Sequence, residues 1–269
     1  MSNEQARREP AAVRPASTML LLRDGAAGME VFMVVRHHQI DFASGALVFP
    51  GGSIDADDAV VARDAALSGP HAGLDEAAVA FRVGAVRETF EECGILLARD
   101  NATKQLVTAA RASEIEAAHR VALNKGERKF SEIIKASGIV PALDLLVPFA
   151  HWITPLGMPK RFDTQFYLAV APADQLGAHD GSESVDSVWV RPGEAVEGAK
   201  TGKFKLVFAT ERNLIKLARH NTGAATLDAA KEEGVVTVLP EVVRGEKSRL
   251  LRIPAEAGYD GSVFEMPAA

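Results

Sequence analysis

Three glutamates, Glu88, Glu91 and Glu92, occupy positions i, i+3 and i+4 of one segment. In an α-helix, side chains three and four residues apart lie on the same face, so this spacing brings three carboxylates together. Because like charges repel, such a face needs a neutralising partner. A hard divalent cation such as Mg²⁺ prefers oxygen ligands and also binds substrate phosphates. The face is therefore a candidate metal site; a solvated helix surface with an Arg87–Glu91 ion pair is the alternative.

The sequence upstream favours the metal site. A short apolar run at 46–49 stops at Pro50-Gly51-Gly52. A strand that ends in such a turn lets the backbone approach a ligand or metal without obstruction by side chains.

Together these segments resemble the Nudix box, G-x5-E-x7-R-E-U-x-E-E-x-G-U, in which U is aliphatic. Gly52 corresponds to the first glycine and residues 87–95 to the second half, with Thr89 at a usually aliphatic position. Gly52 and Arg87 are 35 positions apart, whereas the pattern requires 14, so about 21 residues are inserted. We place this insertion at 54–74.

The insertion obscures the middle glutamate of the box. Counted back from Arg87, its position falls on Val79, which has no carboxylate. Asp75 and Glu76 are the nearest acids, and neither is assigned to the role.

Further segments resemble the Nudix subgroup with an expanded box, which contains the peroxisomal coenzyme A diphosphatases. They are Trp-Ile-Thr-Pro at 152–155, Arg-Phe-Asp-Thr at 161–164, Asp-Gly-Ser-Glu at 180–183 and Trp-Val at 189–190. The resemblance covers roughly 15–194.

This resemblance implies an α/β (α+β) fold with a mixed central sheet between helices. It also implies a hydrolase that uses Mg²⁺ or Mn²⁺ and cleaves the diphosphate bond of a nucleoside diphosphate linked to another moiety, CoA or acyl-CoA at the subgroup level. Two alternatives stay open. One is a hydrolase of ADP-ribose, NADH or dinucleoside polyphosphates, and the other is a non-catalytic Nudix-like module that binds a nucleotide and regulates a partner.

The candidate site residues fall into three groups. The expected metal ligands are the backbone carbonyl of Gly52 and the carboxylates of Glu88, Glu91 and Glu92. The candidates for the acid that activates water are Glu88 and Glu183, and Arg87 is expected to orient the glutamates. The expected substrate contacts are Arg36, His38, Arg161 and Phe162, since a guanidinium suits a phosphate and the 3′-phosphate of CoA would give one arginine a specific partner.

The hydrophobic patterning predicts where the elements lie. Strands are expected at 17–23, 29–36, 147–153, 161–170 and 185–190, and the box helix at 75–99. Helices at 106–123 and 130–136 form a helical insertion, about 103–146, that we expect to be one wall of the substrate pocket. Amphipathic segments at 205–220 and 226–233 predict two further helices. Residues 1–16 are expected to be a disordered leader, and 17–269 a single domain.

Composition excludes several function classes. The chain has 269 residues, of which 47% are hydrophobic and 25% charged, which is typical of a globular protein with a sizeable core. A net charge of −6 argues against nucleic acid as a partner, and no apolar run is long enough for a membrane span. The single cysteine, Cys93, excludes an internal disulfide and favours a cytoplasmic location. The expected partner is a small nucleotide substrate, and homodimerisation is left open.

Overall fold

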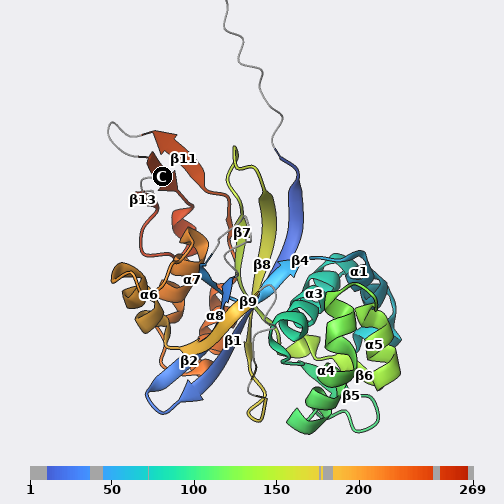
Figure 1. Cartoon of the computed structure of the whole chain (residues 1–269). Coiled ribbons are helices and arrows are strands. Elements are labelled where there is room, and N and C mark those ends of the chain that lie inside the picture. The colour runs from blue at the N-terminus through green and yellow to red at the C-terminus, as the bar shows by residue number, and fades with distance from the viewer. Residues whose placement is uncertain are drawn as a thin grey trace, which may run out of the picture.

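A mixed β-sheet separates two layers of helices in the computed structural model (Figure 1), which describes residues 11–36, 45–71, 73–175, 177, 184–244 and 249–265. In spatial order the strands are β10 (Thr237–Val238), β7 (Val147–Ile153), β8 (Arg161–Val170), β1 (Val13–Gly25), β2 (Gly28–Arg36) and β3 (Leu47–Val48). In addition, β4 (Gly51–Ser53) pairs with β1, and β9 (Ser184–Val190) pairs with β2. The β1–β8 and β7–β10 pairs are parallel and the others are antiparallel.

Strand β1 carries an unbroken apolar run because both of its faces are covered. Met19 and Leu21 belong to one buried cluster, and Leu20 and Leu22 to the other. Successive side chains of a strand point to opposite faces, so the run contributes to both cores. The same strand pairs with β4 near its start and with β2 near its end. It thereby fixes β4 beside the sheet.

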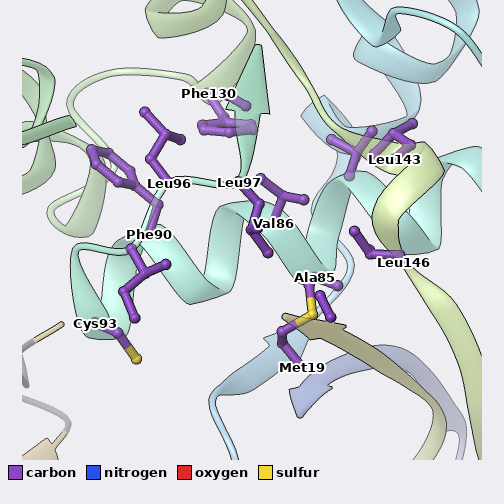
Figure 2. Close-up of a cluster of buried hydrophobic side chains, with 14 of the residues drawn as sticks. Met19, Ala85, Val86, Phe90, Cys93, Leu96, Leu97, Phe130, Leu143 and Leu146 are labelled. Carbon is purple, nitrogen blue, oxygen red and sulfur yellow. The ribbon is translucent and has the colours of Figure 1, made fainter. Parts of the chain in front are cut away.

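The first helical layer contains five helices and a small two-stranded sheet. They are α1 (Ala56–Arg63), α2 (Ala65–Ser68), α3 (Glu76–Cys93), α4 (Ala109–Asn124) and α5 (Phe130–Ser137), with β5 (Ala98–Asp100) paired to β6 (Ile139–Pro141) and a short 3-10 turn at Leu143–Leu145. Figure 2 shows side chains of α3, among them Val86 and Phe90, in one cluster with Leu97 and Phe130. Burial of each such side chain contributes about 1.5–3 kcal/mol to stability.

Helix α3 has clear start and stop signals. The Asp75 side chain accepts a hydrogen bond from the backbone N–H of Ala78 at 2.8 Å, which caps the N-terminus. Gly94 adopts the left-handed conformation, with φ of 70°, and its N–H donates to the carbonyl of Phe90. The helix therefore ends at Cys93, and the predicted extension to residue 99 is wrong because the chain turns at Gly94.

The second layer covers the other face of the sheet. It contains α6 (Pro192–Lys200), α7 (Phe208–Leu217) and α8 (Gly223–Glu233), followed by a separate sheet of β11 (Glu241–Arg244), β12 (Arg249–Arg252) and β13 (Val263–Glu265), with a 3-10 turn at Ala255–Ala257. The predicted central sheet between two layers of helices is confirmed.

Two sequence-based boundaries need revision. The leader was expected to reach residue 16, but β1 begins at Val13, because pairing with β4 and β8 extends the strand beyond its apolar run. Helix α6 was not anticipated, although Pro192 at its first turn is a start signal. Within the described residues, none of the helices combines the length and the hydrophobicity that a membrane crossing requires.

Candidate active site

Arg87 is the centre of a buried network of ionic hydrogen bonds. Its Nε and Nη2 donate to the two carboxylate oxygens of Asp58, both at 2.9 Å, and Nη2 also donates to the Ser53 carbonyl. Its Nη1 donates to Glu88 at 2.8 Å and to Glu91 at 3.1 Å. Each of the five N–H groups of the guanidinium thus has an acceptor. Arg87 ties the acidic face of α3 to α1 and to the end of β4.

Asp58 is a candidate for the middle acid of the box. Val79, on which the count back from Arg87 falls, is fully buried in the apolar cluster and has no carboxylate. The count forward from Gly52 gives Gly-x5-Asp58, and it is Asp58 that binds Arg87. We therefore propose that Asp58 takes the place of the middle acid and that the extra residues follow it; the placement of the insertion at 54–74 stays a prediction. A forward count was the signal that sequence reasoning missed.

Burial dominates the electrostatics of this network. It raises the pKa of Asp58, although the hydrogen bonds and charge of Arg87 oppose the shift. Burial likewise raises the pKa of Glu88 to about 7, with Arg87 lowering it and Glu91 raising it further. Burial would lower the pKa of Arg87, but its partners, Asp58 first, outweigh that effect and raise it, so the guanidinium stays charged.

Strand β4 lies directly against the acidic face. A Cβ atom added to Gly52 would lie 2.6 Å from the Glu88 carboxylate, so only glycine fits there. The N–H of Gly51 donates to a carboxylate oxygen of Glu92 at 3.0 Å. The expected proximity of the Gly52 turn and the box helix is therefore present.

The donors suit a hard cation, but they are not gathered around one point. Carboxylates beside exposed backbone of a strand end are the oxygen ligands that Mg²⁺ and Mn²⁺ prefer. Glu88 and Glu91 both turn to Arg87, and within the described part of the chain no three His, Cys, Asp or Glu side chains form a preassembled metal cluster. Arg87 thus provides part of the neutralising charge, through the Arg87–Glu91 ion pair that the sequence offered as an alternative and a second one to Glu88.

An apolar cavity of about 380 Å³ meets this acidic face at Gly51. Its lining includes the aromatic side chains of Phe49, Trp152, Phe162, Phe166 and Phe208. Arg36 also lines it, and the buried Nε of Arg36 has no hydrogen-bond partner among the described residues. The cavity therefore combines a large apolar surface with one guanidinium near the carboxylates.

The other predicted substrate contacts do not all lie in this cavity. Phe162 lines the cavity, as expected for a contact residue. Arg161 is buried and donates to the carbonyls of Thr154 and Ala11, at 3.0 and 3.4 Å, and it is absent from the cavity lining. His38 and Glu183 lie outside the described residues.

The helical insertion does not line this cavity. No residue of 103–146 belongs to its wall, which is completed instead by Val207–Thr210, Pro240 and Leu251. The expectation of a pocket wall from α4 and α5 is wrong for this cavity, because these helices pack with α1 and α3 on the opposite side of the sheet.

Comparison with known proteins identifies the class to which this fold and site belong. A family model described as the NUDT19 Nudix domain matches residues 62–210, more than half of the chain. The crystal structure of a NUDIX hydrolase from Alicyclobacillus acidocaldarius superimposes with a TM-score of 0.65 at 29% identity, covering 81% of this chain and 96% of that one. The chain belongs to the Nudix hydrolase family.

Within the family, the similar curated proteins include a putative nudix hydrolase 7 of Caenorhabditis elegans, which is 31% identical over 176 residues, 65% of this chain and 51% of that protein. Acyl-coenzyme A diphosphatase NUDT19 of Xenopus laevis is 28% identical over 212 residues, which cover 65% of this chain and 56% of that protein. The Homo sapiens protein of the same name is 28% identical over 209 residues, which cover 64% of this chain and 56% of that protein. The chain spans about half the length of the curated relatives it matches.

Proposed function

We propose that this protein is a metal-dependent diphosphatase that hydrolyses the diphosphate bond of CoA or of an acyl-CoA. The observation that carries the proposal is the junction at Gly51, where the apolar cavity with Arg36 meets the Glu92 carboxylate. A diphosphate at this junction would have an apolar space beside it for one of its two substituents. The similarity to proteins named acyl-coenzyme A diphosphatase supports the same substrate class.

The proposed ligands for the cation are Glu88, Glu91, Glu92 and the Gly52 carbonyl. A cation held there would supply Lewis-acid stabilisation of the charge that develops on the diphosphate. The chain itself positions these groups: Arg87 holds the carboxylates of Glu88 and Glu91, and the Gly51 N–H holds that of Glu92.

Glu88 is the proposed general base among the described acids. Its carboxylate lies against the Gly52 strand end and is held by Arg87, which orients it toward the place proposed for the diphosphate. Glu183, the second candidate from the sequence, keeps that status. Addition of water across the diphosphate of CoA gives 3′,5′-ADP and 4′-phosphopantetheine, and an acyl-CoA gives the acylated phosphopantetheine.

A substrate screen tests the proposal. Purified protein is incubated with CoA, octanoyl-CoA, ADP-ribose, NADH and diadenosine polyphosphates, each with Mg²⁺, with Mn²⁺ or with chelator, and the phosphorylated products are separated. We expect CoA species to be cleaved fastest and the chelator to abolish turnover. Faster cleavage of ADP-ribose or NADH would reject the CoA assignment. Nucleotide binding without any turnover would instead indicate a regulatory module.

A further inference from the structure

The C-terminal part of the chain forms one wall of the cavity. Phe208 of α7 and Leu251 of β12 both line the cavity, together with Pro240. The family-model match ends at residue 210, so Pro240 and Leu251 lie beyond it. In Figure 1 the sheet formed by β11, β12 and β13 stands on the same side of the central sheet as α6 and α7.

One face of this small sheet is directed to α7. Val242, Leu251 and Phe264 are paired across its three strands and share that face. The Phe264 ring packs edge-on against Phe208, with ring centroids 5.3 Å apart. Leu250, next to Leu251 in β12, points to the opposite face. The sheet is therefore held with Leu251 in the cavity wall, while Leu250 faces away from it.

The indole N–H of Trp152, whose ring lines the cavity, already has a hydrogen-bond partner within the protein. Its indole N–H donates to the Tyr259 hydroxyl at 2.8 Å, and that hydroxyl donates to the Asn213 side-chain oxygen at 2.7 Å. Trp152 thus presents only its ring to the cavity. The Trp152 N–H is therefore not available to a polar group in the cavity, whereas a hydrocarbon chain needs no such partner.

Size also selects the occupant. About 380 Å³ lies in the lower part of the ~300–1,000 Å³ range typical of small-molecule pockets, enough for part of a large cofactor and not the whole. The diphosphate is placed at Gly51 by the proposed function, on which this inference rests. The remaining apolar space suits a flexible arm that ends in hydrocarbon.

We propose that the wall formed by Phe208 and Leu251 is a specificity-determining element that receives the acyl chain of a CoA thioester. The C-terminal sheet then acts as a gauge of acyl length, which means that the position of Leu251 sets the longest acyl chain that fits in the cavity. Each methylene that enters the cavity should raise kcat/KM by roughly four-fold, until the chain meets the wall.

The test compares acyl-length profiles. The values of kcat/KM are measured for CoA and for acetyl-, butyryl-, hexanoyl-, octanoyl- and dodecanoyl-CoA, for wild type, Leu251→Trp and Leu250→Trp. The larger side chain at 251 should move the optimum to shorter chains and lower the octanoyl-CoA to CoA ratio at least ten-fold. Leu250→Trp, on the opposite face of the same strand, should keep the wild-type profile.

Four results would contradict the gauge or the proposed function. An unchanged profile in folded Leu251→Trp, or the same change in Leu250→Trp, overturns the gauge. If Leu251→Trp does not fold, Leu251→Ala replaces it and should move the optimum to longer chains; an unmoved optimum overturns the gauge equally. A lack of turnover of every CoA species by wild type would refute the proposed function itself, and acyl-length dependence of binding, followed by calorimetry, would then decide the gauge alone.

Discussion

At the scale of single residues, the Asp58–Arg87 ion pair has two structural roles. It joins α1 to the box helix, and it fixes the guanidinium that binds Glu88 and Glu91. Asp58 is fully buried and Arg87 nearly so. Loss of one partner therefore leaves the other charge buried without compensation.

Asp58→Asn is expected to destabilise the fold by about 3–5 kcal/mol, since it breaks a buried ion pair. Chemical denaturation gives the free energy of unfolding. The control is Glu76→Gln, which removes an exposed ion pair with Arg63 at the start of the same box helix and should cost about 0–1 kcal/mol. Equal losses in the two variants would contradict a special role for Asp58.

Glu91→Gln and Glu92→Gln should each remove most of the hydrolytic activity and keep the fold. The amide preserves shape and a hydrogen-bonding oxygen, but it deletes one of the anionic charges that attract a cation. The measurements are kcat on CoA and the thermal midpoint, with Glu76→Gln again as control. Turnover near the wild-type rate in both variants would show that these carboxylates do not anchor the metal.

Arg36→Ala tests which phosphate meets the cavity. The sequence had assigned the 3′-phosphate of CoA to Arg36 or Arg161, but Arg36 lies in the lining with Gly51, beside the proposed diphosphate position. We therefore expect similar losses of kcat/KM on CoA and dephospho-CoA, on the order of 1.5–3 kcal/mol for a lost charged hydrogen bond. A loss confined to CoA would instead place the 3′-phosphate, and with it the adenosine end, in the cavity.

At the scale of elements, helix α4 braces the end of α3. The Nε of Arg120 donates to the backbone carbonyl of Glu91 at 2.8 Å, and the side-chain amide of Asn124 donates to the same oxygen at 3.3 Å. Arg120 also pairs with Glu116. A carbonyl near a helix C-terminus is electron-rich, so a cation there is favourable. The helical insertion thus supports the backbone of the acidic face through α4 and does not line the cavity.

Arg120→Ala should raise the Mg²⁺ concentration needed for half-maximal activity several-fold, because Glu91 loses part of its support. Arg120→Lys should recover part of the effect, and Val121→Ala, at an exposed site on the same helix, should have none. The readouts are the Mg²⁺ activation curve and the thermal midpoint. A lower midpoint with an unchanged activation curve would mean that Arg120 is only structural.

The sequence predicts elements far better than it predicts which elements meet. The strands β7 and β8 fall at the predicted residues, since their apolar and aromatic side chains repeat with a strand pattern. It could not show that Arg161 would be bound by backbone carbonyls, or that Leu251 would join Phe49 in one cavity. Those contacts depend on how distant segments pack, and local periodicity carries no information about that.

At the scale of the whole molecule, the sheet lies between the helices that position the carboxylates and the cavity proposed to bind the substrate. Helices α3, α4 and α5 share the buried cluster on one face, whereas α7 and the C-terminal wall flank the cavity on the other. The two sides meet at β4, where Gly51 lines the cavity and binds Glu92, and Gly52 contacts Glu88. Substrate binding should therefore slow hydrogen exchange in the cavity walls and leave α4 and α5, which contact neither the cavity nor the carboxylates' open side, unchanged.

Hydrogen exchange of the Glu91→Gln variant with and without octanoyl-CoA tests this separation, because the variant should bind without rapid turnover. We expect slower exchange in α7 (Phe208–Leu217) and β12 (Arg249–Arg252), since a ligand that fills the cavity suppresses local opening of its walls. Residues 109–137, which contain α4 and α5, should exchange at unchanged rates. Protection confined to residues 109–137 would restore the helical insertion as the substrate wall and place recognition on the opposite face of the sheet.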